Sequence, residues 1–184
     1  ECRQIKYHAA FTYGYDNNVY FFQGSNIYLY DDQHMRVADG YPKPINEVFK
    51  GIPSNIDAVF TWGKDGATYF FKDNLYYKYN DKNKKVESGY PRESKSRWIG
   101  MPSKIDAIFT LKMSLDGKDN YPTYIIHRGE SSYIDPVTER ITNTKKLEER
   151  FIGLYDTSVL PEETNSNVPD VTNQSTPTII TTSV

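Results

Sequence analysis

The 184-residue chain has a single cysteine, Cys2, and no apolar run of about eighteen residues. One cysteine cannot form a disulfide within the chain, so Cys2 is either a free thiol or half of a bridge to a cysteine outside it. Without a long apolar run, we expect no membrane span inside the chain. The 22 basic and 24 acidic residues nearly balance, and a net charge of −2 does not fit a general nucleic-acid binder.

Signatures of catalysis are also missing. The three histidines, His8, His34 and His127, stand apart in the sequence, and no His-Glu-x-x-His zinc motif occurs. There is no Gly-x-Ser-x-Gly elbow and no glycine-rich phosphate loop. We therefore expect no enzyme activity from this chain and no haem site. The chain starts at Glu1 with neither a methionine nor an apolar leader, as expected of a mature or excised segment.

Tyrosine and phenylalanine are abundant instead, with 16 and 9 copies, which favours strands over helices. An internal repeat organises them, because a shift of 49 residues places 8–55 on 57–104 with 18 of 48 positions identical. A third copy opens at Ile105–Phe109 and then departs, with about six residues inserted around Ser114–Asp119. Aromatic residues recur at matching sites and are expected in the core, namely Phe11, Phe21, Phe60, Phe70, Phe109 and Tyr124.

Each repeat carries the signals of four short strands. In the second copy they are Ile56–Trp62, Ala67–Lys72, Leu75–Tyr79 and Lys85–Glu87, and Pro91 is placed to start a short helix that leads to Trp98. Four-stranded antiparallel units at this period are typical of propeller blades. We predict an all-β propeller over residues 1–157, with blades at about 5–55, 56–104 and 105–157 and a fourth blade missing or degenerate.

The repeat motifs resemble those of hemopexin-like domains. The second copy carries the whole series, at Ile56–Phe60, Tyr69–Lys72, Tyr77–Tyr79, Gly89–Pro91 and Trp98–Pro102. The resemblance implies a four-bladed propeller that acts as a secreted, extracellular and non-catalytic binding module for matrix proteins, protease substrates or protease inhibitors. The alternative is the C-terminal hemopexin-like part of a zinc-dependent matrix metalloproteinase whose catalytic domain lies outside this chain.

The resemblance also implies a calcium ion in the central tunnel, bound by main-chain oxygens of the innermost strands. The repeated Asp57 and Asp106 open these strands, and their equivalent in the first copy is His8. The ligand set would be His8, Ala10, Asp57, Val59, Asp106 and Ile108. On the residues alone, Asp57 and Asp106 could instead only hold neighbouring backbone amides. In the metalloproteinase version Cys2 would be bridged to a cysteine of the fourth blade, which is outside this chain.

The chain departs from the family pattern at its end. Only 27 residues follow Thr157, too few for a fourth blade, so the chain is either a fragment or a genuine three-blade form. Such a gap would expose rings of the end blades, for example Phe11, Phe21 and Tyr124, and would favour self-association. Residues 158–184 are rich in Thr, Ser, Asn and Pro and predict a disordered stalk or linker, which would tether the domain. Its sequon, Asn173-Gln174-Ser175, is either glycosylated or unmodified.

Binding residues are expected where the repeats differ, on loops and outer edges. The sequence does not tell which of them form one patch. The candidates are Tyr13, Tyr15, Lys43, Lys64, Lys82, Lys84, Lys85, Arg92, Lys95 and Arg97.

Overall fold

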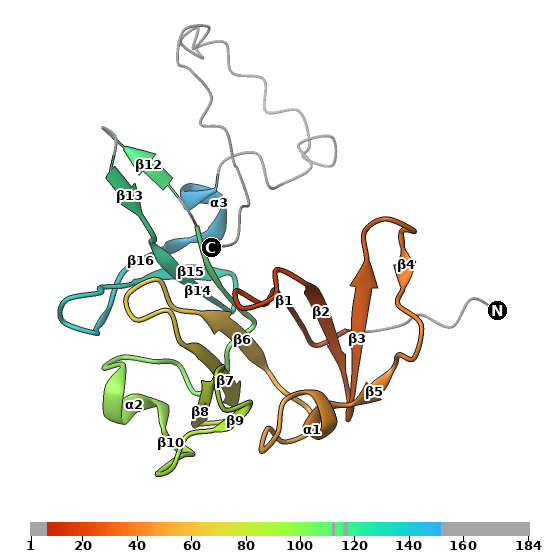
Figure 1. Cartoon of the computed structure of the whole chain (residues 1–184). Coiled ribbons are helices and arrows are strands. Elements are labelled where there is room, and N and C mark those ends of the chain that lie inside the picture. Colours follow the sequence, from red (N-terminus) through yellow and green to blue (C-terminus); the bar gives the residue numbers. More distant parts are fainter. Residues whose placement is uncertain (1–6, 112, 116–117, 152–184) are drawn as a thin grey trace, which may run out of the picture.

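Three antiparallel sheets follow one another along the chain and fan out around their first strands (Figure 1). The computed structural model describes residues 7–111, 113–115 and 118–151. Cys2 and the segment 158–184 therefore lie outside the described residues. The expectation of an all-β fold made of propeller blades is confirmed.

The first two blades have the same order of elements, as their sequence identity predicts. Each has four strands in sequence order, a short fifth strand paired with the third, and one helical turn. Blade 1 consists of β1 (Ala9–Thr12), β2 (Val19–Gln23), β3 (Asn26–Asp31), β4 (Arg36–Val37), β5 (Lys43–Pro44) and α1 (Ile45–Val48). Blade 2 consists of β6 (Ala58–Thr61), β7 (Thr68–Lys72), β8 (Leu75–Asn80), β9 (Lys85–Val86), β10 (Arg92–Glu93) and α2 (Ser94–Arg97). The helix expected directly after Pro91 begins later, because β10 comes first.

The third blade keeps the four-stranded sheet and adds a hairpin. Its elements are β11 (Ala107–Thr110), β14 (Thr123–His127), β15 (Glu130–Ile134), β16 (Ile141–Lys146) and α3 (Leu147–Arg150). The extra residues expected around Ser114–Asp119 form a separate two-stranded sheet, β12 (Met113–Leu115) and β13 (Lys118–Asn120). The insertion therefore extends a loop and leaves the blade intact, because loops accept added residues at little cost.

Two aromatic cores lie between adjacent blades. The first contains Phe11, Tyr20 and Phe22 of blade 1 together with Val59 and Phe70 of blade 2. The second contains rings of blade 2 and isoleucines of blade 3, namely Phe60, Tyr69, Phe71, Trp98, Ile108, Ile125 and Ile134. Successive residues of a strand point to opposite faces, so blade 2 contributes Phe70 to one core and Tyr69 and Phe71 to the other.

The segments after α1 and α2 each bind to the next blade through backbone hydrogen bonds. The Lys50 carbonyl, after α1, accepts a hydrogen bond from the Val86 amide of β9 at 3.0 Å. Ile99, after α2, exchanges backbone hydrogen bonds with the third blade, and its carbonyl accepts from the Ile141 amide at 2.8 Å. Blades 1 and 3 are left at the two ends of the arc (Figure 1). Among the described residues no helix is long and apolar enough to cross a membrane.

Candidate functional site

One repeat position supports the same turn in each blade. The Asp57 carboxylate accepts a hydrogen bond from the Asp73 amide, and the Asp106 carboxylate accepts one from the Arg128 amide, both at 2.6 Å. In the first blade the Nδ1 atom of His8 lies 3.4 Å from the Gly24 amide, at the equivalent turn. All three side chains therefore hold the turn between the second and third strands of their blades.

The main-chain oxygens named for the calcium ion lie on the inner strands. The Trp62 amide bonds to the Ala67 carbonyl in the register of β6 and β7. Hydrogen-bonded and non-bonded pairs alternate in an antiparallel ladder, so the peptide groups of Val59 point away from β7. The same alternation applies to Ala10 and Ile108. No group of three or more acidic, histidine or cysteine side chains that could hold a metal occurs among the described residues. A calcium ion on these strands would therefore need main-chain oxygens as its ligands from the described residues.

Several of the expected binding residues meet where blade 1 contacts blade 2, at a surface we call the first seam. Tyr13 Oη donates a 2.6 Å hydrogen bond to the carboxylate of Asp81, in the turn after β8. Lys84 Nζ lies 3.6 Å from the centre of the Tyr15 ring and 3.3 Å from Tyr13 Oη. Tyr15 is 59% exposed, whereas Tyr13 is only 2% exposed. The expectation of Tyr13 as a surface residue is therefore wrong, because its ring packs into the first core.

Three further lysines extend this surface. The backbones of Lys50 and Lys85 pair directly, and Lys82 lies in the neighbouring turn. All three side chains are exposed, and none takes part in an ion pair with any described residue. We define the first seam by Tyr13, Tyr15, Lys50, Asp81, Lys82, Lys84 and Lys85.

We call the contact between blades 2 and 3 the second seam. Its charged side chains pair with one another. Arg97 donates to Glu139 at 3.1 Å and to Tyr69 Oη at 2.7 Å, and its guanidinium stacks within 4.9 Å of the Trp62 ring centre. Lys64 Nζ donates to the same Glu139 carboxylate at 2.7 Å. Although partial burial opposes ionisation, the hydrogen bonds from Lys64 and Arg97 lower the pKa of Glu139 below its ordinary value of 4.5. The expectation of Arg97 as a free binding residue is therefore wrong.

The other candidates lie apart from both seams. Lys43 lies over the ring of Tyr41, and Arg92 over the ring of Tyr90, each beside a Tyr-Pro pair. Lys95 is exposed on α2. These three residues do not form a common patch with either seam.

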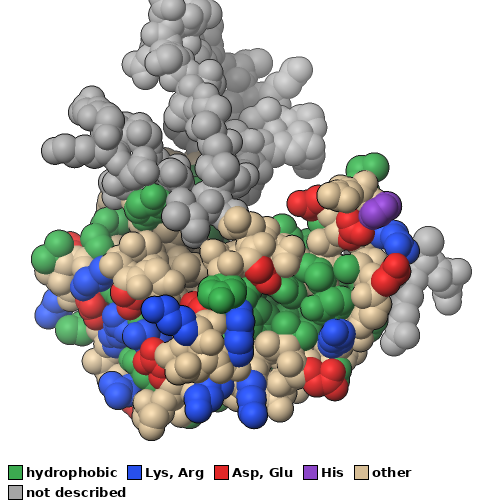
Figure 2. All heavy atoms as spheres, viewed as in Figure 1, with side chains coloured by type: hydrophobic (Ala, Val, Ile, Leu, Met, Phe, Trp, Pro, Cys, Tyr) green, Lys and Arg blue, Asp and Glu red, His purple; other side chains and the backbone are tan. Residues whose placement is uncertain are grey.

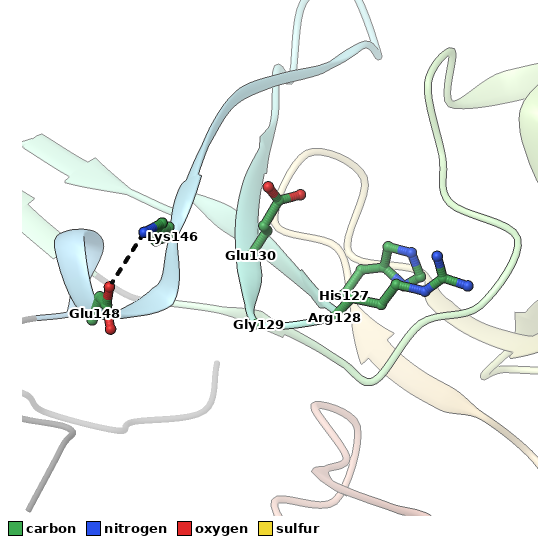
Figure 3. A pocket seen from close by; sticks show the side chains of 6 residues that line it. All are labelled: His127, Arg128, Gly129, Glu130, Lys146 and Glu148. Atoms are coloured by element: carbon green, nitrogen blue, oxygen red, sulfur yellow. Dashed lines mark ion pairs between the residues drawn. The ribbon is translucent and has the colours of Figure 1, made fainter.

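A shallow depression of about 640 Å³ lies at the edge of blade 3 (Figure 3). It is lined by His127, Arg128, Gly129, Glu130, Lys146 and Glu148. His127 and Arg128 lie at one side, away from the ion pair of Lys146 with Glu148 at 3.9 Å. The side chains do not converge, so this depression has no pairing of a nucleophile with a base.

Among the described residues, the end blades each present an apolar face that no other blade covers. On blade 1, Phe21, Tyr28, Tyr30 and Val37 line a hollow of about 270 Å³, and Figure 2 shows hydrophobic side chains gathered over this blade. On blade 3, the rings of Phe109, Tyr124 and Phe151 cluster with centroids 5.6 to 5.8 Å apart. We call these the open faces.

The expectation that Phe11 belongs to an open face is wrong. Phe11 is 9% exposed and lies in the first core, 6.0 Å from the ring of Phe70. Its neighbour across the strands is Tyr20, whereas Phe21 pairs with Ala10 and points to the other side. A difference of one residue decides the face in a strand.

Comparisons with known proteins agree with this architecture. The sequence profile of the Hemopexin family matches residues 8–54 and 56–103, just over half of the chain. No curated protein matches. Among solved structures, LS24, a seed albumin from Lathyrus sativus, is 18% identical with a TM-score of 0.58, covering 77% of this chain and 66% of its own. The hemopexin fold protein CP4 from cow pea is 19% identical with a TM-score of 0.54, covering 72% and 64%.

A third similar structure is a plant albumin from Cicer arietinum described as showing hemagglutination, 20% identical with a TM-score of 0.58, covering 80% of this chain and 72% of its own. The chain thus spans about two thirds of the length of these proteins. At such identities the solved structures support the fold alone. The two repeats matched by the family profile, which cover more than half of the sequence, show that this chain belongs to the hemopexin family.

Proposed function

We propose that this chain is a non-catalytic module that binds extracellular proteins, namely matrix proteins, protease substrates or protease inhibitors. The observation that carries the proposal is the first seam, where Tyr15 and four lysines lie outside both cores at positions that differ between the repeats. Exposed tyrosines are enriched in protein interfaces, and their side chains lose little entropy on binding.

A biosensor experiment tests this function. The purified chain is passed over immobilised collagen, fibronectin and protein inhibitors of proteases. We expect at least one of them to bind, and Tyr15→Ala to weaken that binding while the thermal unfolding midpoint stays unchanged. Met35→Ala is the matched control, because Met35 is 80% exposed on a turn of blade 1 outside the first seam. Absence of binding to every protein on the panel would overturn the proposal.

Membership of a matrix metalloproteinase stays a prediction from the family resemblance. The chain alone is expected to cleave no protein, since the described residues offer no arrangement for peptide hydrolysis. A homogeneous preparation incubated with casein and zinc measures this. Zinc-dependent cleavage that copurifies with the chain would contradict it.

We also propose a structural calcium ion on the inner strands, supported by the peptide oxygens of Ala10, Val59 and Ile108, which point away from the second strand of their blades. A ligand that binds only the folded state raises the unfolding midpoint. We expect millimolar calcium to raise the midpoint relative to chelator, and Asp57→Asn to keep this response, because the main-chain oxygen is unchanged. Equal midpoints in calcium and chelator would count against the ion.

A further inference from the structure

At equivalent repeat positions, the two seams have residues of different charge. Tyr15 of the first seam corresponds to Lys64 of the second, and Lys50 corresponds to Ile99, by the shift of 49 residues. Lys84 corresponds to Glu139, by the shift of 55 that applies after the insertion in the third repeat. The second seam therefore neutralises its cations with Glu139, while the first seam has lysine at the position of that carboxylate.

The first seam has more lysines than its carboxylate can neutralise. Asp81 accepts a 2.6 Å hydrogen bond from Tyr13 Oη and lies near the charge of Lys84, while burial, the largest effect, raises the pKa of Asp81 above its ordinary value. The ammonium group of Lys84 lies over the rings of Tyr13 and Tyr15. Lys50, Lys82 and Lys85 then remain exposed without an anionic partner among the described residues.

Neighbouring charges of one sign create a local potential that attracts an ion or segment of the opposite sign. Lys50 and Lys85 lie on directly paired backbones, with Lys82 and Lys84 in the adjacent turn. All four cations are lysines, whose compact ammonium groups act as point charges and do not need a planar, two-pronged partner. Single carboxylates along an extended segment suit this arrangement, and the exposed Tyr15 ring adds apolar contact beside them.

We propose that the first seam is a docking site for an acidic segment of a partner protein, with Lys50, Lys82 and Lys85 pairing its carboxylates beside the platform of Lys84 and Tyr15. This site deepens the proposed protein-binding function and rests on it. It is consistent with the lack of an ion-pair partner for Lys50, Lys82 and Lys85 among the described residues, in contrast to Lys64 of the second seam, which pairs with Glu139.

Fluorescence anisotropy with a labelled octaglutamate peptide tests the site. The wild-type chain is compared with the double variant Lys82→Gln/Lys85→Gln and with the control Lys95→Gln/Lys104→Gln. The control removes two exposed lysines that also lack ion pairs with described residues, so both double variants change the net charge equally. We expect the seam variant to bind roughly tenfold more weakly, since it loses two exposed ion pairs, and the control to change less than about twofold.

Each outcome of this experiment either supports or overturns the proposed docking site. Equal weakening in both double variants, or no peptide binding at physiological ionic strength, would overturn the site. Binding of heparin without binding of the peptide would assign a sulfated polysaccharide and overturn the protein segment. Peptide binding that depends on the seam lysines, combined with no binding to the panel of matrix proteins and inhibitors, would retain the site and reject those partners.

Discussion

Two carboxylates show how single residues hold this fold together. The Asp57 carboxylate accepts a hydrogen bond from a backbone amide of its own blade, and the Glu139 carboxylate accepts hydrogen bonds from two cationic side chains of the neighbouring blade. The first interaction stabilises a local turn. The second stabilises the contact between two blades.

Removal of the turn acceptor at Asp57 should destabilise the chain. Asp57→Ala leaves the Asp73 amide without its acceptor, and we expect the free energy of unfolding to fall by about 1–2 kcal/mol. Asp57→Asn keeps an acceptor oxygen and should cost less. Urea unfolding measures both, with Asp39→Ala as control, because Asp39 pairs only with Arg36 at the surface. Equal losses of unfolding free energy for Asp57→Ala and Asp39→Ala would contradict the role of Asp57 in holding the turn.

The ion pairs of Glu139 should make the free energy of unfolding depend on pH and decrease in acid. Its pKa is lower in the folded chain than the ordinary value of 4.5, so the unfolded state binds more protons as the pH falls. The stabilisation is therefore complete above about pH 5 and declines as the pH falls through 4.5 and below. We expect the difference in unfolding free energy between wild type and Glu139→Gln to follow this course. A difference that stays constant from pH 6 to pH 3 would refute it.

Among the structural elements, the segments after α1 and α2 each contain a glycine at their closest approach to the next blade. Gly51 has a φ of +92° and lies against β9, where an added Cβ would come within 3.0 Å of Val86 Cγ2. Gly100 repeats this arrangement against Ile141 of β16, with a φ of +92° and an approach of 3.3 Å. The positive φ and the close approach to the next blade therefore both favour glycine at these two positions.

Gly51→Ala and Gly40→Ala separate backbone strain from this steric contact. Gly40 also has a positive φ, +81°, but an added Cβ would meet nothing within 4 Å. We expect Gly40→Ala to cost about 1 kcal/mol for its backbone conformation, and Gly51→Ala to cost about 1–3 kcal/mol more because Val86 must shift. Chemical unfolding of both variants measures the difference. Equal costs would show that Val86 moves aside freely.

At the scale of the whole molecule, the open faces should drive association. The rings of Phe21, Tyr28 and Tyr30 correspond to Phe70, Tyr77 and Tyr79, which pack against or within the first core. In blade 2 that apolar face is covered by blade 1, whereas the same face of blade 1 has no blade against it among the described residues. Exposed apolar patches of this kind favour protein contacts.

We predict concentration-dependent self-association through the open faces. Tyr30→Glu places a charge on the face of blade 1 and should reduce the associated fraction in sedimentation velocity while the fold is retained. Val137→Glu is the control, because Val137 is 85% exposed on a turn of blade 3. A wild-type chain that stays monomeric at high micromolar concentration, without binding a dye for exposed apolar surface, would contradict the prediction.

Much of the fold could be predicted from the sequence because its signals are local and repeated. Strand positions followed from aromatic and turn residues such as Tyr69–Lys72, and the insertion near Ser114–Asp119 followed from a change in spacing. The faces were harder to assign. Phe11 and Phe21 occupy equally apolar repeat positions, and only the register of β1 with β2 shows that they point to opposite sides.

The repeat, the blades and the hemopexin family could be recognised from local sequence patterns, since hydrogen-bonded strands and tight turns depend on residues close together in the chain. Which candidate residues share a surface depends on how the blades pack. Tyr13 and Asp81 are 68 positions apart, and Lys64 and Glu139 are 75 apart, so no local pattern connects them. Packing one blade on the next brings these residues together, and it leaves the lysines of the first seam exposed while Arg97 of the second becomes part of the structure.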